Sequence, residues 1–174
     1  MEKQTPTRIA IHWSASNRPE SCYHINVLRD GKVIHQAPPT ERLPRHTKLR
    51  NTGTVAIAAI GMVDAIFEDF GKFALTNNQI EALCAEAANL VVQYNIPIDT
   101  DHIFTHCEAA LTDGYGPYQG EPDLRWDFMI LRPTVGIKTE KQAKLWASTT
   151  GRVLRTKIRW YAERIKERKA KDGL

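Results

Sequence analysis

Apolar residues along the chain form short strand-like runs in its first part and helically spaced positions further on. Four runs are apolar or alternate between apolar and polar residues, and turn residues bound them, which predicts β-strands. These runs cover residues 8–13, 23–28, 54–60 and 102–105. Between residues 28 and 33, Asp30-Gly31 supplies the positive φ of a tight hairpin, so residues 33–36 are predicted to return antiparallel to the second strand.

Two segments show the spacing of helices. Thr76 and Gln79 have the spacing of a capping box, and the apolar positions that follow up to residue 94 lie on one helical face until Pro97 ends the helix. Residues 139–171 are predicted to form one long helix, or two if Gly151 breaks it. Residues 111–124 are predicted as a loop and residues 126–131 as a short helix.

This mixture predicts an α/β fold in which helices flank a single central, mostly β-sheet. A basic helical extension follows at the C-terminus. We therefore expect a domain over residues 1–133 and an extension over residues 134–174.

Composition places the chain among globular proteins. It has 174 residues, of which 42% are hydrophobic and 25% charged, which is enough for one domain with a core and excludes a disordered or collagen-like chain. No apolar run approaches the ~20 residues of a membrane-spanning helix, and no signal peptide is visible. The three cysteines lack zinc-finger spacing and are expected to be reduced thiols.

Charge is distributed unevenly. Residues 152–171 contain nine Lys or Arg and two Glu, a local charge of +7, whereas the rest of the chain carries −3. A basic segment of this kind favours an anionic partner, such as nucleic acid, a membrane surface or an anionic cell wall.

Histidines supply the candidate chemistry. Three of the six, His12, His24 and His106, lie at or beside the ends of predicted strands. No local metal-binding motif is present, so their spacing alone leaves structural and ligand roles open for each.

An ordered set of motifs resembles the type 2 N-acetylmuramoyl-L-alanine amidases, zinc amidases of the peptidoglycan-recognition-protein fold, and most of all their short phage and prophage endolysins. The set runs Ile9-Ala-Ile-His-Trp-Ser-Ala15, Tyr23-His24, Arg29-Asp-Gly-Lys-Val33, Asn51-Thr-Gly-Thr-Val-Ala-Ile57, Thr105-His-Cys-Glu108 and Arg125-Trp-Asp127.

The resemblance implies a zinc site made by His12, His106 and Asp127, with Asp123 as the alternative third ligand. Two imidazoles, one carboxylate and an open position form the usual catalytic zinc site. Bound zinc makes water acidic enough to attack an amide at neutral pH.

The resemblance also assigns roles around that site. Tyr23 is expected to orient water and move its proton, because the position of a glutamate base used by some members is here Ala58. Arg125 is expected to hold the oxyanion. Glu108 is expected to accept a hydrogen bond from His106, and His46 and Asn51 are expected to contact substrate.

The resulting expectation is a zinc hydrolase that cuts the bond between N-acetylmuramic acid and L-alanine in bacterial peptidoglycan, as an endolysin in host cell lysis. Such an enzyme would reside in the host cytoplasm and act in the periplasm or cell wall after release. The basic tail would attract an anionic wall or membrane surface, and no nucleic acid is expected. The alternatives are a non-catalytic peptidoglycan-binding module of the same fold and a nucleic-acid-binding protein that uses the tail.

Overall fold

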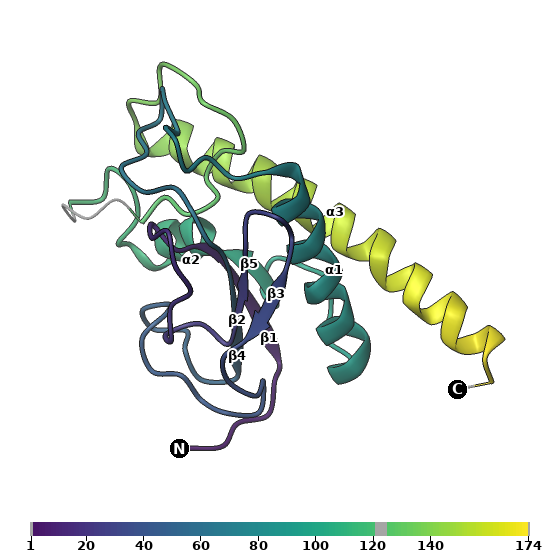
Figure 1. Ribbon diagram of the computed structural model, residues 1–174. Helices are drawn as coiled ribbons and strands as arrows, with labels where there is room; N and C mark the ends of the chain where they lie inside the picture. Colours follow the sequence, from purple (N-terminus) through teal and green to yellow (C-terminus); the bar gives the residue numbers. More distant parts are fainter. Residues whose placement is uncertain (1, 121–124, 174) are drawn as a thin grey trace.

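One five-stranded sheet forms the centre of the computed structural model, which describes residues 2–120 and 125–173. The strands are β1 (Arg8–Trp13), β2 (Ile25–Val27), β3 (Val33–His35), β4 (Thr54–Ala59) and β5 (Ile103–Thr105). They lie in the order β3-β2-β4-β1-β5, with β3 antiparallel to β2 and every other pair parallel. The predicted strands, the hairpin and the α/β fold are confirmed (Figure 1).

Three helices accompany the sheet. They are α1 (Asn77–Tyr94), α2 (His106–Asp113) and α3 (Glu140–Lys171). α3 packs along α1 and also contacts α2 and β5, and Figure 1 shows it as the longest element, running past the sheet to the C-terminus. None of the helices in the ranges that the structure describes is long and apolar enough to cross a membrane.

The two central strands explain why this sheet is stable. All six residues of β4 and five of the six in β1 are buried, as expected for parallel strands covered on both faces. Ile9, Ile57 and Leu83 belong to one apolar cluster that also includes Leu154 and Ile158 of α3. Residues beyond 133 thus complete the same core, while a functional division at residue 133 stays a prediction.

The predicted start and end of α1 are confirmed. The Thr76 hydroxyl accepts a hydrogen bond from the amide of Gln79, and the Gln79 side chain accepts one from the amide of Thr76. Gln79 also donates to the carbonyls of Val27 and Ile60, at 3.1 and 2.8 Å. Asn95 ends the helix in the left-handed conformation.

Two local predictions are wrong. Residues 111–113, expected in a loop, form the end of α2, which begins after Thr105 because Thr105 and Glu108 make a second capping box. Residues 126–131 contain turns and bends rather than a short helix. Cys107 is buried in α2, and the three cysteines are free thiols.

Gly151 does not interrupt α3, which continues through it. A Cβ atom at this position would collide with the carboxylate of Glu108, which is itself held by Arg155 through two 2.9 Å contacts. Gly151 therefore allows α2 and α3 to approach closely.

Replacing Gly151 with alanine is expected to destabilise the protein by about 1–3 kcal/mol, the usual cost of overpacking, although alanine favours helix by about 1 kcal/mol. Urea unfolding of Gly151→Ala beside Ser148→Ala, at an exposed position of the same helix, checks this. A stabilised Gly151→Ala protein would contradict the close approach.

Candidate metal centre

His12, His106 and Asp127 meet at the carboxyl end of the central strands. One potential ligand atom from each lies within 4.8 Å of the other two. His12 is the fifth residue of β1, and the parallel register places Ile11 beside Thr105, so His12 and His106 emerge next to each other. The order of the strands thus brings together two histidines that are far apart in the sequence.

Buried aromatic residues position Asp127. Trp126 packs edge-on against Trp13, with ring centroids 4.6 Å apart, and Phe128 on the other side is fully buried. The backbone carbonyl of Asp127 accepts a hydrogen bond from the amide of Cys107. The carboxylate is therefore held over the start of α2 by its neighbours on both sides.

The distances suit a tetrahedral metal ion. Oδ2 of Asp127 is 3.3 Å from Nδ1 of His12 and 3.3 Å from Nδ1 of His106. Tetrahedral zinc ligands at about 2.0–2.1 Å from the ion lie about 3.3 Å from one another. The three side chains therefore fit a divalent ion such as zinc, with a fourth position left for water or substrate.

The protonation states of His12 and Asp127 agree with metal binding. Burial lowers the pKa of His12 to about 4, against the opposing effect of its hydrogen bond to Asp127. Burial alone would raise the pKa of Asp127, but the charge and hydrogen bonds of His106 and His12 hold it well below its usual value. At neutral pH, His12 offers a lone pair and Asp127 a carboxylate, as a metal ligand set requires.

A hydrogen-bonded chain lies behind His12. Its Nε2 is 3.1 Å from the hydroxyl of Thr47, which is 2.9 Å from Nδ1 of His46. If Nδ1 of His12 binds a metal, Nε2 carries the proton and donates to Thr47, which then donates to His46. The contact between Thr47 and His12 was not predicted, because Thr47 is 35 residues from His12 in the sequence.

An open cavity of about 550 Å³ adjoins the three side chains, of which His12 is fully buried. His106 and Asp127 line it, together with the predicted residues Tyr23, His46, Asn51 and Arg125. Cationic side chains that the sequence did not single out, Arg45 and Lys48, line it as well. Asp123, the alternative ligand, lies outside the described residues.

The predicted site residues differ in what they contact. The ring of Tyr23 lies 5.0 Å from that of His12, centroid to centroid. Burial, followed by the Asp127 charge, raises the pKa of Tyr23 well above its usual value, so the phenol stays protonated. Arg125 is exposed at the cavity.

Asn51 mainly shapes the loop that carries His46. Its carbonyl oxygen accepts hydrogen bonds from the amides of His46 and Thr47, and its amide nitrogen donates to Pro44. His24, the third histidine beside a strand end, is held by the Glu41 carbonyl and the Ala56 amide instead of joining the metal ligands.

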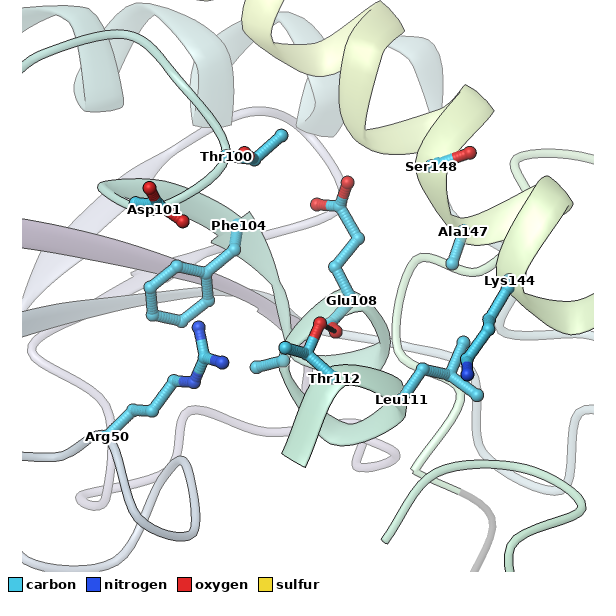
Figure 2. Close-up of a pocket in the computed structure, with 11 residues that line it drawn as sticks. Arg50, Thr100, Asp101, Phe104, Glu108, Leu111, Thr112, Lys144, Ala147 and Ser148 are labelled. Atoms are coloured by element: carbon cyan, nitrogen blue, oxygen red, sulfur yellow. Dashed lines mark hydrogen bonds between the residues drawn. The ribbon is translucent and has the colours of Figure 1, made fainter. Parts of the chain in front are cut away.

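The predicted contact of Glu108 with His106 is wrong. The carboxylate of Glu108 instead pairs with Arg155 of α3 and accepts from the amide of Thr105, because α2 turns its side chain away from the metal ligands. Figure 2 shows Glu108 in a second cavity, where the Arg50 guanidinium lies 5.1 Å from the centre of the Phe104 ring. Arg50 is paired with Asp113 and Glu108 with Arg155, so these two charged groups of the cavity are engaged in structural contacts.

Comparison with known proteins gives a family match. The sequence profile described as N-acetylmuramoyl-L-alanine amidase matches residues 2–119. No curated protein matches the chain significantly.

Solved structures resemble the chain at low identity. The hydrolase AmiA of Staphylococcus aureus is 16% identical, with 91% of this chain and 78% of that chain covered and a TM-score of 0.51, which supports the fold. The Ph2119 endolysin of a Thermus scotoductus MAT2119 bacteriophage is 23% identical over 62% of this chain and 75% of that chain, with a TM-score of 0.48. The amidase LysC of Clostridium intestinale URNW is 19% identical over 61% and 73%, also at 0.48.

Proposed function

The chain belongs to the N-acetylmuramoyl-L-alanine amidase family, and on this premise we propose that it is a metal-dependent hydrolase of peptidoglycan. The bond that it hydrolyses would be the amide between N-acetylmuramic acid and L-alanine. The observation that carries the proposal is the convergence of His12, His106 and Asp127 within 4.8 Å at an open cavity. A module that only binds peptidoglycan has no need of such a ligand set.

The proposed cofactor is zinc, held by His12, His106 and Asp127. When bound, such an ion supplies Lewis-acid chemistry, since it polarises a carbonyl and makes water acidic enough to attack at neutral pH. The chain itself provides neutral imidazole at His12 and a carboxylate at Asp127.

Tyr23 and Arg125 would act on the substrate from the cavity wall. Because the Tyr23 phenol stays protonated, we assign it a hydrogen bond that orients the attacking water or the scissile amide, rather than a role as a phenolate base. Arg125 would place its guanidinium against the oxygen on which negative charge develops. Arg45 and Lys48, also at the cavity, would attract the carboxylates of the peptide stem.

Incubation of the purified protein with isolated peptidoglycan tests the proposal. New N-terminal alanine is expected, which a chelator abolishes and added zinc restores. A folded, zinc-loaded protein that releases no new amine would contradict the proposal and favour the binding module.

A lytic role as an endolysin, with release from a host cytoplasm to the wall, stays a prediction from the sequence resemblance. Expression in bacteria with and without an added export signal tests it. Lysis that depends on export is expected. Growth unaffected by exported, active enzyme would contradict a lytic role.

Thr47 offers a test of how the metal ligands are positioned. Thr47→Val removes the hydroxyl between His12 and His46 while keeping the shape of the side chain. Loss of such an outer partner is expected to lower zinc affinity about 10- to 100-fold. Competition with a chromogenic chelator measures this, and Thr47→Ser, which keeps the hydroxyl, is the control. Equal affinity in Thr47→Val and wild type would show that the hydroxyl does not orient His12.

A further inference from the structure

The outward face of α3 carries large apolar side chains that the described part of the chain leaves partly exposed. Trp146, Val153 and Trp160 are 40%, 39% and 51% exposed. They recur every seven residues, two helical turns, and therefore line one face over about 21 Å. The opposite face of the helix, with Leu154 and Ile158, is buried in the core. We call Trp146, Val153 and Trp160 the outer stripe.

Basic residues surround and extend the outer stripe. Arg164 stacks on Trp160, with 5.1 Å between its guanidinium and the ring centre. Among the residues that the structure describes, seven exposed cations of α3 have no ion-pair partner: Lys141, Arg152, Arg159, Lys166, Arg168, Lys169 and Lys171. Figure 1 shows this part of the helix, coloured yellow, extending away from the sheet. By helical spacing, Arg168 and Lys171 continue the outer stripe and Arg152 and Arg159 flank it, so this side of the helix combines apolar area with positive charge.

Three partners could cover this face of α3: a second copy of the helix, nucleic acid or a membrane. Charge and apolar area distinguish among them. In an antiparallel pair of two α3 helices, Arg152 and Arg159 would flank the seam in both copies and repel each other. Double-stranded nucleic acid offers phosphates but no apolar layer at its surface, so Val153 and the two tryptophans would remain in water. A bilayer of anionic phospholipids offers both, since tryptophan favours the headgroup region and basic side chains favour anionic headgroups.

We propose that α3 binds the surface of anionic phospholipid membranes through the outer stripe. Trp146, Val153 and Trp160 would enter the headgroup region, and Arg168 and Lys171, which follow on the same side of the helix, would contact lipid phosphates. This binding is independent of the amidase chemistry and of the metal ligands.

Vesicle flotation and tryptophan fluorescence test the proposal. The full chain is mixed with vesicles of phosphatidylcholine alone or of equal parts phosphatidylcholine and phosphatidylglycerol. Binding is expected only to the anionic vesicles, with a blue shift of emission that comes from Trp146 and Trp160, because Trp13 and Trp126 are already buried. Added double-stranded DNA should compete weakly.

Matched variants distinguish binding through the outer stripe from a general effect of the protein's net charge. Arg168→Glu combined with Lys171→Glu is expected to lower the partition coefficient at least about tenfold, since each basic residue near an anionic surface contributes about fivefold. Lys32→Glu combined with Lys72→Glu changes net charge equally at exposed positions outside α3 and should have a much smaller effect. Trp146→Gln combined with Trp160→Gln should abolish the blue shift and weaken binding.

Several outcomes would overturn the proposal: no binding to anionic vesicles, equal binding to both vesicle types, or an equal loss in both charge-reversal pairs. Displacement from vesicles by stoichiometric DNA would assign the face to nucleic acid. If the wild type is a dimer in analytical ultracentrifugation and the combined Trp146→Gln and Trp160→Gln variant is a monomer, the outer stripe would be assigned to contact with a second copy. Because vesicle binding is read without peptidoglycan, its failure is distinguishable from failure of the amidase proposal.

Discussion

Asp127→Asn is expected to lose zinc binding and amidase activity together. The substitution keeps the size of the side chain but removes the negative charge that faces Nδ1 of both His12 and His106 at 3.3 Å. Loss of a partner outside the ligand shell costs about 10- to 100-fold in affinity or activity, so loss of a ligand is expected to cost at least about a hundredfold in each.

Calorimetric titration with zinc and the release of N-terminal alanine from peptidoglycan measure the two effects. Asp64→Asn is the matched control, since it makes the same charge change in the same cavity outside the ligand cluster, and it should keep zinc binding. Asp64 has a positive φ, which asparagine tolerates. Unchanged zinc binding and alanine release by Asp127→Asn would show that Asp127 is not the third ligand.

Arg155→Met is expected to destabilise the fold by about 3–5 kcal/mol, the usual cost of breaking a buried ion pair. The side chains of Arg155 and Glu108 are only 9% and 12% exposed, and Arg155 also donates to the carbonyl of Ile103 at 2.9 Å. Its removal leaves the Glu108 carboxylate in the interior without its cation. The Arg155 side chain thus links α3 both to α2, through Glu108, and to β5, through Ile103.

Urea unfolding with a double-mutant cycle tests this effect. Adding Glu108→Gln to Arg155→Met removes the uncompensated charge and should recover much of the lost stability. Lys144→Met breaks an exposed pair with Glu140 in the same helix and should cost less than about 1 kcal/mol. Equal, small losses in Arg155→Met and Lys144→Met would show that the pair contributes little to the fold.

Sequence alone determined most of the elements that hold the site. The β-branched runs, Asp30-Gly31, and the capping residues Thr76 and Gln79 act on near neighbours, and the strands, hairpin and α1 formed where they predicted. A second capping box, Thr105 with Glu108, has the same local spacing and marks the start of α2, but the predicted strand over residues 102–105 and loop over residues 111–124 left this helix out.

Tertiary structure decided what the chemically active side chains contact. His12 and Asp127 are 115 residues apart, and Glu108 and Arg155 are 47 apart. The ordered motifs of the sequence identified the ligands through a family resemblance. They did not indicate that Thr47 would bridge His12 and His46. Nor did they indicate that Glu108 would pair with α3, or that Gly151 would leave space for its carboxylate. Those contacts depend on strand order and helix packing, in which residues far apart in the chain meet, whereas capping and turn preferences depend only on neighbours a few residues away.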